Sequence, residues 1–364
     1  TFTDSIVYKQ KPKYIVNTDS VSGFNLENIK EGTYFLAALK EENPNYTYQS
    51  KSDKIGYRKQ FITVPSDTAY VLKMFKESVD YKFKRAKQVS SSKLAFGYEG
   101  DGETMDIQLL SDVPEGHASI VTKETDKDTL NYWFRPKLEN DSLIFEITHK
   151  QSVDTAVVKI KDFKSDSLIF KSLSSTLKLK EFYKLSATIP LDSIDATKVR
   201  IMDKDSLFQR PTMILDSFSN VVDFDFEKTE NNNYSIEMLP GAFTDFYGIQ
   251  NDTLNFKVTT KLGSSYGDVR IKVRNGIYPL IVQLTGEKGE VVESYVSQEV
   301  SPVDFNQVNP GIYFLRVIFD TNQNGVYDSG DYLKKIQPEQ VSYALESVEV
   351  RAGWDTIEEF ILED

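Results

Sequence analysis

Residues 311–331 read Gly-Ile-Tyr-Phe-Leu-Arg-Val-Ile-Phe-Asp-Thr-Asn-Gln-Asn-Gly-Val-Tyr-Asp-Ser-Gly-Asp. The part up to Phe319 is an apolar run of β-branched and aromatic residues, which predicts a strand rather than an amphipathic helix. The part from Asp320 onward places oxygen-bearing side chains at loop positions 1, 3, 5, 9 and 12 and glycine at position 6, the ligand pattern of a calcium loop. Because a strand precedes the loop, we do not expect the helix pair of an EF-hand.

This loop predicts a site for one structural Ca²⁺ ion. Its predicted ligands are the side chains of Asp320, Asn322, Asn324, Asp328 and Asp331 and the carbonyl oxygen of Val326. Position 12 is the shorter Asp331 instead of the usual bidentate Glu, so we expect modest affinity, suited to extracellular calcium. The alternative is a metal-free hairpin loop rich in Asn, Asp and Gly, and the sequence leaves both open.

The same pattern occurs near the start of the chain. Residues 26–36 (Leu-x-x-Ile-x-x-Gly-x-Tyr-Phe-Leu) match residues 305–315 (Phe-x-x-Val-x-x-Gly-x-Tyr-Phe-Leu), which indicates a duplicated module. In this register the first loop has Glu41, Asn43 and Asn45 at positions 1, 3 and 5. The later positions carry uncharged residues: Tyr46 stands opposite Gly325, Gln49 opposite Asp328 and Ser52 opposite Asp331. The first copy has lost most of its charge, and we expect that it has lost the metal as well.

The composition excludes several functional classes. With 364 residues, of which 40% are hydrophobic, the chain is long enough for two to four domains. A net charge of −12 repels nucleic acid and anionic membrane surfaces and suits divalent cations. The absence of cysteine excludes disulfides and thiolate chemistry. No apolar run could span a membrane, and because the chain starts Thr-Phe-Thr we interpret it as a segment of a processed precursor anchored upstream.

Short β-patterned runs recur about every 8–12 residues between turn-forming residues, which is typical of stacked β-sandwiches. The fold class that we predict is therefore all-β. The runs are residues 60–64, 70–75, 93–98, 131–134, 143–148, 156–160, 221–226, 268–273 and 280–284. We divide the chain into sandwich modules at 1–75, 76–173, 174–262 and 263–364, and we interpret the cationic stretch 76–87 as a solvated connector.

The triplet Asp-Ser/Thr-aliphatic recurs along the whole chain. It begins at Asp4, Asp19, Asp67, Asp128, Asp141, Asp154, Asp166, Asp192, Asp205, Asp252 and Asp355. One interpretation is structural, because Asp closes a turn while the hydroxyl and aliphatic residues start the next strand. The other is that the triplets resemble the O-glycosylation acceptor motif of Bacteroidota, with a sugar on the hydroxyl.

A search for reactive groups yields no catalytic residue and no cofactor site. Residues 263–267 fit the Gly-x-Ser-x-Gly elbow of serine hydrolases, but no helix pattern and no later histidine follow, so we interpret them as a linker. His117 lies in a turn pattern and His149 is expected to face solvent on a strand. Trp133 and Trp354 could form a carbohydrate platform, although strand alternation assigns part of the first aromatic cluster to a core.

Together these motifs resemble a family. The repeated Gly-x-Tyr-Phe-Leu strand with its Asp-x-Asn-x-Asn-Gly loop is similar to transthyretin-like and carboxypeptidase-regulatory-like modules of bacterial surface proteins, at 1–75 and 263–364. Residues 190–260, with Leu239-Pro-Gly-Ala, resemble the Ig-like domain of Bacteroidota outer-membrane lipoproteins, and residues 76–173 match an Ig-like domain only loosely.

The resemblance implies a non-catalytic lipoprotein segment, lipid-anchored at the outer membrane, the cell surface or its periplasmic face. Its expected role is a scaffold that binds outer-membrane or surface proteins, as a subunit of an assembly, export or uptake complex. It implies no enzyme activity and no nucleic-acid partner, and O-linked glycans would decorate the triplets. The alternatives are a glycan-binding protein of a nutrient-uptake system and, more remotely, a carboxylate-dependent hydrolase.

Overall fold

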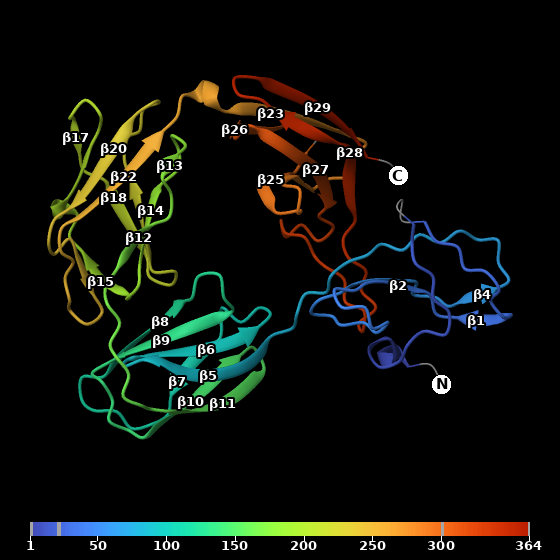
Figure 1. Ribbon diagram of the computed structural model, residues 1–364, viewed down its shortest axis with the longest axis horizontal. Coiled ribbons are helices and arrows are strands. Elements are labelled where there is room, and N and C mark those ends of the chain that lie inside the picture. Colours follow the sequence, from blue (N-terminus) through green and yellow to red (C-terminus); the bar gives the residue numbers. More distant parts are fainter. Residues whose placement is uncertain (1–2, 20–22, 300–301, 363–364) are drawn as a thin grey trace. The chain divides into compact units, whose positions relative to one another are not determined.

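The computed structural model describes residues 3–19, 23–299 and 302–362, and nearly all of their regular structure is β-strand (Figure 1). The helical elements among them are short 3-10 turns, at Asp4–Tyr8, Ala196–Lys198 and Gly263–Ser265. The predicted all-β chain of tandem β-sandwiches is confirmed. The chain divides into two compact units, residues 80–266 and residues 1–79 with 267–364. The module boundaries at 75, 173 and 262 stay predictions.

The 80–266 unit begins with a sandwich of two antiparallel sheets, in the orders β5-β6-β9-β8 and β11-β10-β7. Alternation in β10 directs Leu143, Phe145 and Ile147 into the core, where each is fully buried. The strands are β5 (Lys82–Ser90), β6 (Lys93–Glu99), β7 (Asp106–Leu109), β8 (Ala118–Lys123), β9 (Thr129–Arg135), β10 (Ser142–His149) and β11 (Ser152–Lys159).

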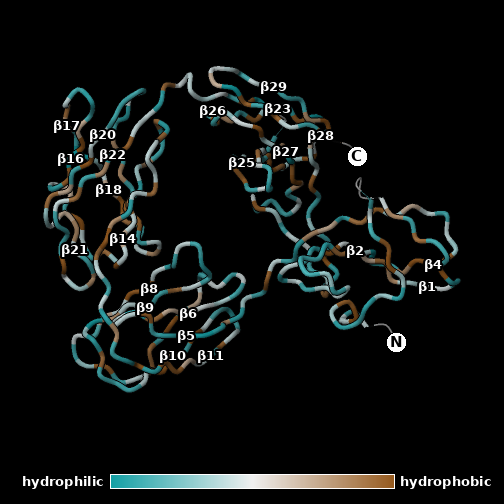
Figure 2. Tube along the Cα trace, in the orientation of Figure 1, coloured by the Kyte–Doolittle hydropathy of each residue, from teal (hydrophilic) through white to brown (hydrophobic). Residues whose placement is uncertain are grey.

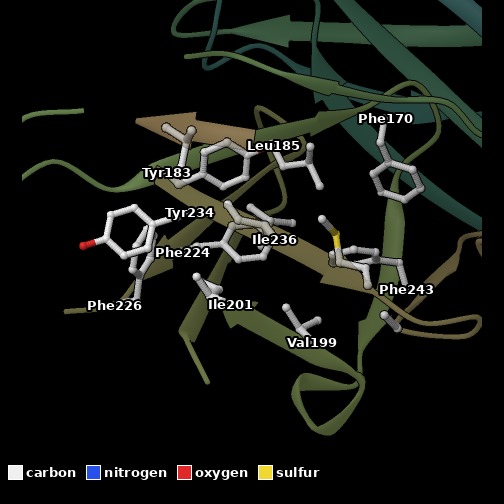
Figure 3. Packing of buried hydrophobic residues seen from close by; sticks show 14 of the residues in the cluster. Phe170, Tyr183, Leu185, Val199, Ile201, Phe224, Phe226, Tyr234, Ile236 and Phe243 are labelled. Carbon is white, nitrogen blue, oxygen red and sulfur yellow. The ribbon is translucent and has the colours of Figure 1, made fainter. Parts of the chain in front are cut away.

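The second sandwich of this unit packs a four-stranded sheet, β12-β14-β19-β18, on a five-stranded one, β13-β22-β20-β16-β17. Its core is aromatic and aliphatic, with Tyr183, Phe224 and Phe243 fully buried between the sheets (Figure 3). The strands are β12 (Phe170–Ser172), β13 (Thr176–Leu177), β14 (Tyr183–Ala187), β15 (Leu191–Ile194), β16 (Val199–Met202), β17 (Phe208–Gln209), β18 (Thr212–Asp216), β19 (Val221–Asp225), β20 (Asn233–Met238), β21 (Phe243–Asp245) and β22 (Leu254–Thr260).

A small separate core joins these two sandwiches. Trp133 of the first packs with Ile189 and Phe246 of the second, and none of the three is more than 5% exposed. The Trp133 indole N–H donates to Thr122 Oγ1 at 2.9 Å, and the Arg135 guanidinium lies 4.5 Å from the Phe246 ring centroid. A buried apolar junction of this kind restrains domain motion, which explains why residues 80–266 form one compact unit.

The C-terminal part of the other unit is a third sandwich, with sheets β26-β23-β29 and β25-β24-β27-β28. Strand β23 alternates strictly between buried and exposed residues, and Figure 2 shows hydrophobic and hydrophilic segments interleaved along such strands. The last strand pairs parallel with β23 and so closes the sandwich. The strands are β23 (Gly267–Arg274), β24 (Leu280–Thr285), β25 (Val291–Ser297), β26 (Val303–Val308), β27 (Gly311–Phe319), β28 (Val341–Val350) and β29 (Asp355–Ile361).

The N-terminal part of the same unit has much less regular structure. Its described residues form two-stranded sheets, β1 with β4 and β2 with β3. These strands are β1 (Gly32–Tyr34), β2 (Ala37–Lys40), β3 (Lys54–Tyr57) and β4 (Ile62–Val64). Its core includes Tyr48, Ile55, Tyr57 and Phe75 together with Tyr332, which comes from the C-terminal part.

Some local predictions are wrong. Residues 70–75 form no strand beyond a single bridge between Phe75 and Ile55, because only that residue reaches a neighbouring backbone. The cationic stretch from Lys82 onward is an edge strand, β5, whose cations remain exposed while Phe83 and Ala86 pack on the core. His149 is 4% exposed and stacks on Tyr81, with ring centroids 4.0 Å apart, instead of facing solvent.

Other local predictions hold. Residues 263–265 form a 3-10 turn that leads into β23, as the linker interpretation requires. Several Asp-Ser/Thr-aliphatic triplets stand where a strand begins, including Thr129 of β9, Ser142 of β10 and Asp355 of β29, in keeping with the structural interpretation. In the triplet at Asp19, Ser20 and Val21 lie outside the described residues.

Candidate functional site

The candidate calcium loop connects β27 to β28 and begins with a buried carboxylate. Asp320, which is 1% exposed, accepts hydrogen bonds from the backbone N–H groups of Asn324, at 3.0 Å, and Gly325, at 2.8 Å. Gly325 has a φ of 77°, a left-handed conformation that glycine adopts without strain. The side chain of Asp320 therefore folds the chain into the sharp turn that the sequence predicts at position 6.

The middle of the loop gathers more oxygen-bearing side chains. Asp328 Oδ2 accepts bonds from the side-chain amides of Asn322, at 2.5 Å, and Asn324, at 2.8 Å. In this arrangement each amide presents its nitrogen to Asp328, while Asn324 Oδ1 accepts from the Val326 N–H at 2.9 Å. A cation needs oxygen donors, so its binding would require both amides to turn their oxygens inward.

Asp331, the predicted ligand at position 12, is held by a different turn. Its Oδ1 accepts from the Lys334 N–H at 2.8 Å, and its Oδ2 lies 2.8 Å from the Lys334 ammonium. Burial works to raise the pKa of the Asp331 carboxyl, but the bonds from Lys334 outweigh it, so the pKa is lowered. Five of the six predicted ligands therefore lie in one hydrogen-bonded loop, and the sixth belongs to the next turn.

Glu339 is a carboxylate of the loop that sequence reasoning missed. Its Oε1 accepts from the Thr321 N–H at 2.8 Å, and its Oε2 accepts from the Asp328 N–H at 3.1 Å. One carboxylate thus ties the two ends of the loop together. Glu339 lies beyond the twelve-residue window of a calcium loop, and spacing alone gave no signal for it.

The donor set fits calcium in its chemistry, because it consists of hard oxygen donors. Among the described residues, however, no group of three or more His, Cys, Asp or Glu side chains is placed to hold a metal ion. The acidic members within the loop are Asp320, Asp328 and Glu339. Coordination of an ion would therefore depend on the neutral oxygens of Asn322, Asn324 and the Val326 carbonyl as much as on these carboxylates.

The loop after β2 repeats this arrangement with Glu41 and Asp53 in the places of Asp320 and Glu339 and with the uncharged Gln49 in the place of Asp328. Glu41 Oε1 accepts from the N–H groups of Asn45, at 3.0 Å, and Tyr46, at 2.7 Å, as Asp320 accepts from Asn324 and Gly325. Tyr46 has a φ of 64° where Gly325 has 77°. Asp53 accepts from the N–H groups of Glu42 and Gln49, as Glu339 accepts from Thr321 and Asp328.

The strands before the loops repeat as well. The Tyr34 hydroxyl donates to the Lys30 carbonyl at 2.6 Å, and the Tyr313 hydroxyl donates to the Asn309 carbonyl at 2.7 Å, in both cases four residues back. The duplication inferred from the sequence is therefore visible in hydrogen bonds that no sequence comparison uses. The two loops differ in length after this point. Asp53 follows its hydrogen-bond donor Gln49 by four positions in the sequence, whereas Glu339 follows its donor Asp328 by eleven.

The extra residues of the second loop form a turn that we call the strap, residues 329–337. Asp331 and Ile336 exchange backbone hydrogen bonds of 2.9 Å at its base. Tyr332 at its tip is fully buried in the core of the N-terminal part. The candidate calcium loop is thus directly continuous with a contact between the two ends of the chain.

Two open clefts of the described structure differ in the charge of their lining residues. One open cleft, of about 410 Å³, has the cations Lys198, Arg200 and Arg210 and the exposed Phe208 among its lining residues. A second cleft, of about 220 Å³, has Arg270 bound to Asp304 at 2.6 Å, so this carboxylate is neutralised by an ion pair. Asp268 and Asp355 also line this second cleft, and Asp268 accepts a hydrogen bond from the Gln307 N–H at 2.8 Å.

The aromatic residues considered for carbohydrate binding differ in exposure. Trp133 is 2% exposed and belongs to the junction core, so its assignment to a sugar platform is wrong. Trp354 is 61% exposed, with the Arg351 guanidinium 5.6 Å from its ring centroid. Only Trp354 of the two could stack on a ligand.

Comparisons with known proteins find structural matches whose scores are too low to support an argument about fold or function. No protein-family model and no curated protein sequence matches the chain. A tandem from titin covers 78% of this chain and 100% of its own, at 8% identity and a TM-score of 0.16. A Dscam structure, described for its isoform specificity, covers 90% of this chain and 100% of its own, at 8% identity and a TM-score of 0.19. An I-band titin fragment covers 76% of this chain and 98% of its own, at 11% identity and a TM-score of 0.17. Scores this low carry no functional argument.

Proposed function

We propose that this chain is a non-catalytic scaffold that binds protein partners through an exposed sheet face. The face belongs to the sheet β25-β24-β27-β28. On β27, Tyr313 and Leu315 point into the core, whereas the alternate residues Ile312 and Phe314 are 64% and 39% exposed. The adjacent edge strand β28 adds exposed large apolar residues, Tyr343 at 63% and Leu345, which is fully exposed.

This apolar face is the observation on which the proposal rests. A face of large apolar side chains beside an unpaired strand edge suits protein contact, through side-chain burial and through strand addition. Following the resemblance of the sequence, we propose an outer-membrane or cell-surface partner protein, with the chain anchored by a lipid upstream.

Co-purification from the native membrane, with mass spectrometry, tests this proposal. The intact chain should recover a partner in near-stoichiometric amount. A variant with Tyr343→Ser and Leu345→Ser should lose it, because both side chains are exposed and their loss removes apolar contact area and not core packing. The matched control carries Val153→Ser and Val157→Ser on β11, residues that are 65% and 62% exposed in the other unit. Recovery that is equal for both variants would refute the assigned face.

We propose in addition that the loop 320–339 binds one structural Ca²⁺ ion. Asp320, Asn322, Asn324, Asp328 and the Val326 carbonyl would supply donors, with Glu339 beside them. Asp331 would join only if its turn with Lys334 opens. The proposal is supported by the spacing of the oxygen-bearing residues and by three carboxylates, Asp320, Asp328 and Glu339, that each accept hydrogen bonds from groups of this loop.

The second candidate function is glycan binding, and the exposed Trp354 with its neighbouring Arg351 favours it. An indole face stacks on sugar rings, and the Arg351 guanidinium beside it is held by Glu349 at 2.6 Å. Retardation in a polysaccharide affinity gel that disappears in Trp354→Ala but persists in Trp133→Phe would establish it. Equal mobility of Trp354→Ala and the unaltered chain would exclude a platform at this residue.

We also propose O-linked glycans on the triplets, following the resemblance noted above. The hydroxyl residues Thr68, Ser167, Ser193, Ser206 and Thr253 are exposed. Mass spectrometry of peptides from protein made in the native organism should find added hexose or related masses on these residues. Unmodified peptides at all of them would refute the proposal.

A further inference from the structure

The N-terminal part of the chain cannot complete a core from its own residues. It has two-stranded sheets, and such sheets are marginal in water without further packing. Of the fully enclosed residues in its core, Tyr48, Ile55, Tyr57 and Phe75 are its own, while Tyr332 comes from the strap. A small domain with so few buried residues needs an additional element to be stable.

Tyr332 occupies the centre of this core. It is 0% exposed, and its ring centroid lies 5.0 Å from that of Tyr57 in an edge-to-face arrangement. The rings of Tyr8, Phe35 and Tyr48 surround it at centroid distances of 6.0, 6.0 and 6.4 Å. These are the separations and orientations that aromatic rings prefer. The rings therefore form a pocket of defined shape.

The backbone of the strap is bound at both ends. At one end the Tyr332 N–H donates to Glu77 Oε1, and Glu77 Oε2 also accepts from the Tyr48 hydroxyl at 2.7 Å. At the other end the Tyr57 hydroxyl donates to the Ile336 carbonyl, and the Gln337 side chain donates to the Tyr57 carbonyl, both at 3.3 Å. Peptide sites combine backbone bonds for affinity with side-chain pockets for specificity in this way.

Lys335 supplies a second specific contact. Its ammonium lies 4.1 Å from the centroid of Tyr332, 5.5 Å from Tyr57 and 5.8 Å from Phe35, and 2.8 Å from Asp4 Oδ1. A cation held over aromatic faces and next to a carboxylate is recognised by both charge and shape. Leu333 and Lys334 between the two anchors are exposed. The contacted pattern is therefore Tyr-x-x-Lys.

We infer that the N-terminal part carries a binding site for a turn-forming Tyr-x-x-Lys peptide, and that the strap of the same chain is its ligand. The first copy of the module has no strap, because only three residues lie between Gln49 and Asp53. The strap is thus an insertion in the second copy that binds the first copy. It unites residues 1–79 with residues 267–364 in one unit, across an intervening segment of the chain, residues 80–266.

A strap-replaced chain and a synthetic peptide test this inference. In the full chain, residues 329–337 are replaced by a Gly-Ser linker, and binding of a peptide with residues 328–339 is measured by calorimetry. The replaced chain should bind the peptide one to one, whereas the intact chain, whose site is filled, should not. A Tyr332→Ala peptide should lose binding, a Lys335→Ala peptide should bind about 3- to 30-fold more weakly, and a Leu333→Ala peptide should bind unchanged. Equal binding of all peptides, or none to the replaced chain, would overturn the site.

A second measurement applies if the replaced chain does not fold. Hydrogen exchange of the intact chain is compared between Tyr332→Ala and the control Leu333→Ala, whose side chain is 55% exposed. Tyr332→Ala should speed exchange of amides in residues 35–77, and Leu333→Ala should leave them unchanged. Unchanged exchange in both variants would refute the inference. A dimer in which the strap fills the site of a second copy would support it, because the same contacts would form between chains.

Discussion

Trp133→Ala should destabilise the 80–266 unit more than any exposed substitution. Trp133 is 2% exposed at the junction core with Ile189 and Phe246, and its indole N–H bonds to Thr122. A tryptophan buries about 150–250 Å², which at about 25 cal/mol per Å² corresponds to about 4–6 kcal/mol. Alanine keeps a small part of this contact, so we expect a loss of about 3–5 kcal/mol in the free energy of unfolding, as for other buried Trp→Ala changes.

Urea denaturation followed by circular dichroism, combined with hydrogen exchange, measures this loss and locates it. The protection of residues 80–266 should fall, and that of β23–β29 should not. Trp354→Ala is the matched control, since its indole is 61% exposed, and it should change the unfolding free energy by less than about 0.5 kcal/mol. Trp133→Phe should lose about 1 kcal/mol through the hydrogen bond and part of the ring contact. A Trp133→Ala effect within about 1 kcal/mol of the control would show that the junction does not stabilise the unit.

Two further predictions concern the unit formed by the chain ends. Saturating calcium, at about ten to a hundred times Kd, should stabilise this unit by about 1.4–2.7 kcal/mol in thermal melts. Glu339→Gln should remove most of that gain and Asp331→Asn little of it, and a reversed order would assign the ion to the Asp331 turn. At alkaline pH the strap should open, because burial raises the pKa of Tyr57 from 10.0 to about 12 and the pKa values of Tyr8, Tyr48 and Tyr332 further still. The unfolded chain releases these protons at lower pH than the folded chain does. The contribution of the buried tyrosines to the free energy of unfolding is therefore fully present below about pH 10 and falls between about pH 10 and 12. Tyrosinate absorbance and hydrogen exchange should change together there, and ionisation near pH 10 without opening would refute the link.

The sequence predicted the sandwich architecture because its signals are local. Strict alternation, as in β23, and turn residues at regular spacing determine where a strand begins and which side chains face a core. The prediction of strands was less accurate where a strand is irregular or pairs with a neighbouring strand over few residues. Strand β5 shifts register between Phe83 and Arg85, which breaks the alternation and made its cations look like a connector.

The candidate loop was predicted in part for the same reason. Asp320, Asn322, Asn324 and Asp328 follow a local spacing rule, and the structure brings them into one loop. Glu339 reaches that loop only because the strap folds back on itself through the Asp331–Ile336 bridge. Position along the chain gave no indication of this, since closing a loop of such length depends on tertiary contacts.

The burial of Trp133 and Tyr332 was beyond the reach of sequence patterns. Each lies where two separately patterned elements meet, so its burial depends on a neighbour far along the chain. His149 differs, because it continues the buried face of β10 after Phe145 and Ile147, so strand alternation predicts its burial. Trp133 alternates with Tyr132 and Phe134 in β9, which predicts one buried and one exposed face, but the face of Trp133 is covered by another sandwich. Predictions of exposure from alternation hold for a single sandwich and fail at junctions.

The duplicated loops show how such a junction could arise from a repeat. Both copies keep the same carboxylate contacts, through Glu41 and Asp53 in one and Asp320 and Glu339 in the other. These contacts fix the turn whatever lies between Gln49 and Asp53 or between Asp328 and Glu339. An insertion at this point therefore leaves the turn intact and projects outward, where surface loops tolerate added length at small entropic cost. In the second copy the added segment carries Tyr332 and Lys335, and both contact the tyrosine-rich core of the first part of the chain.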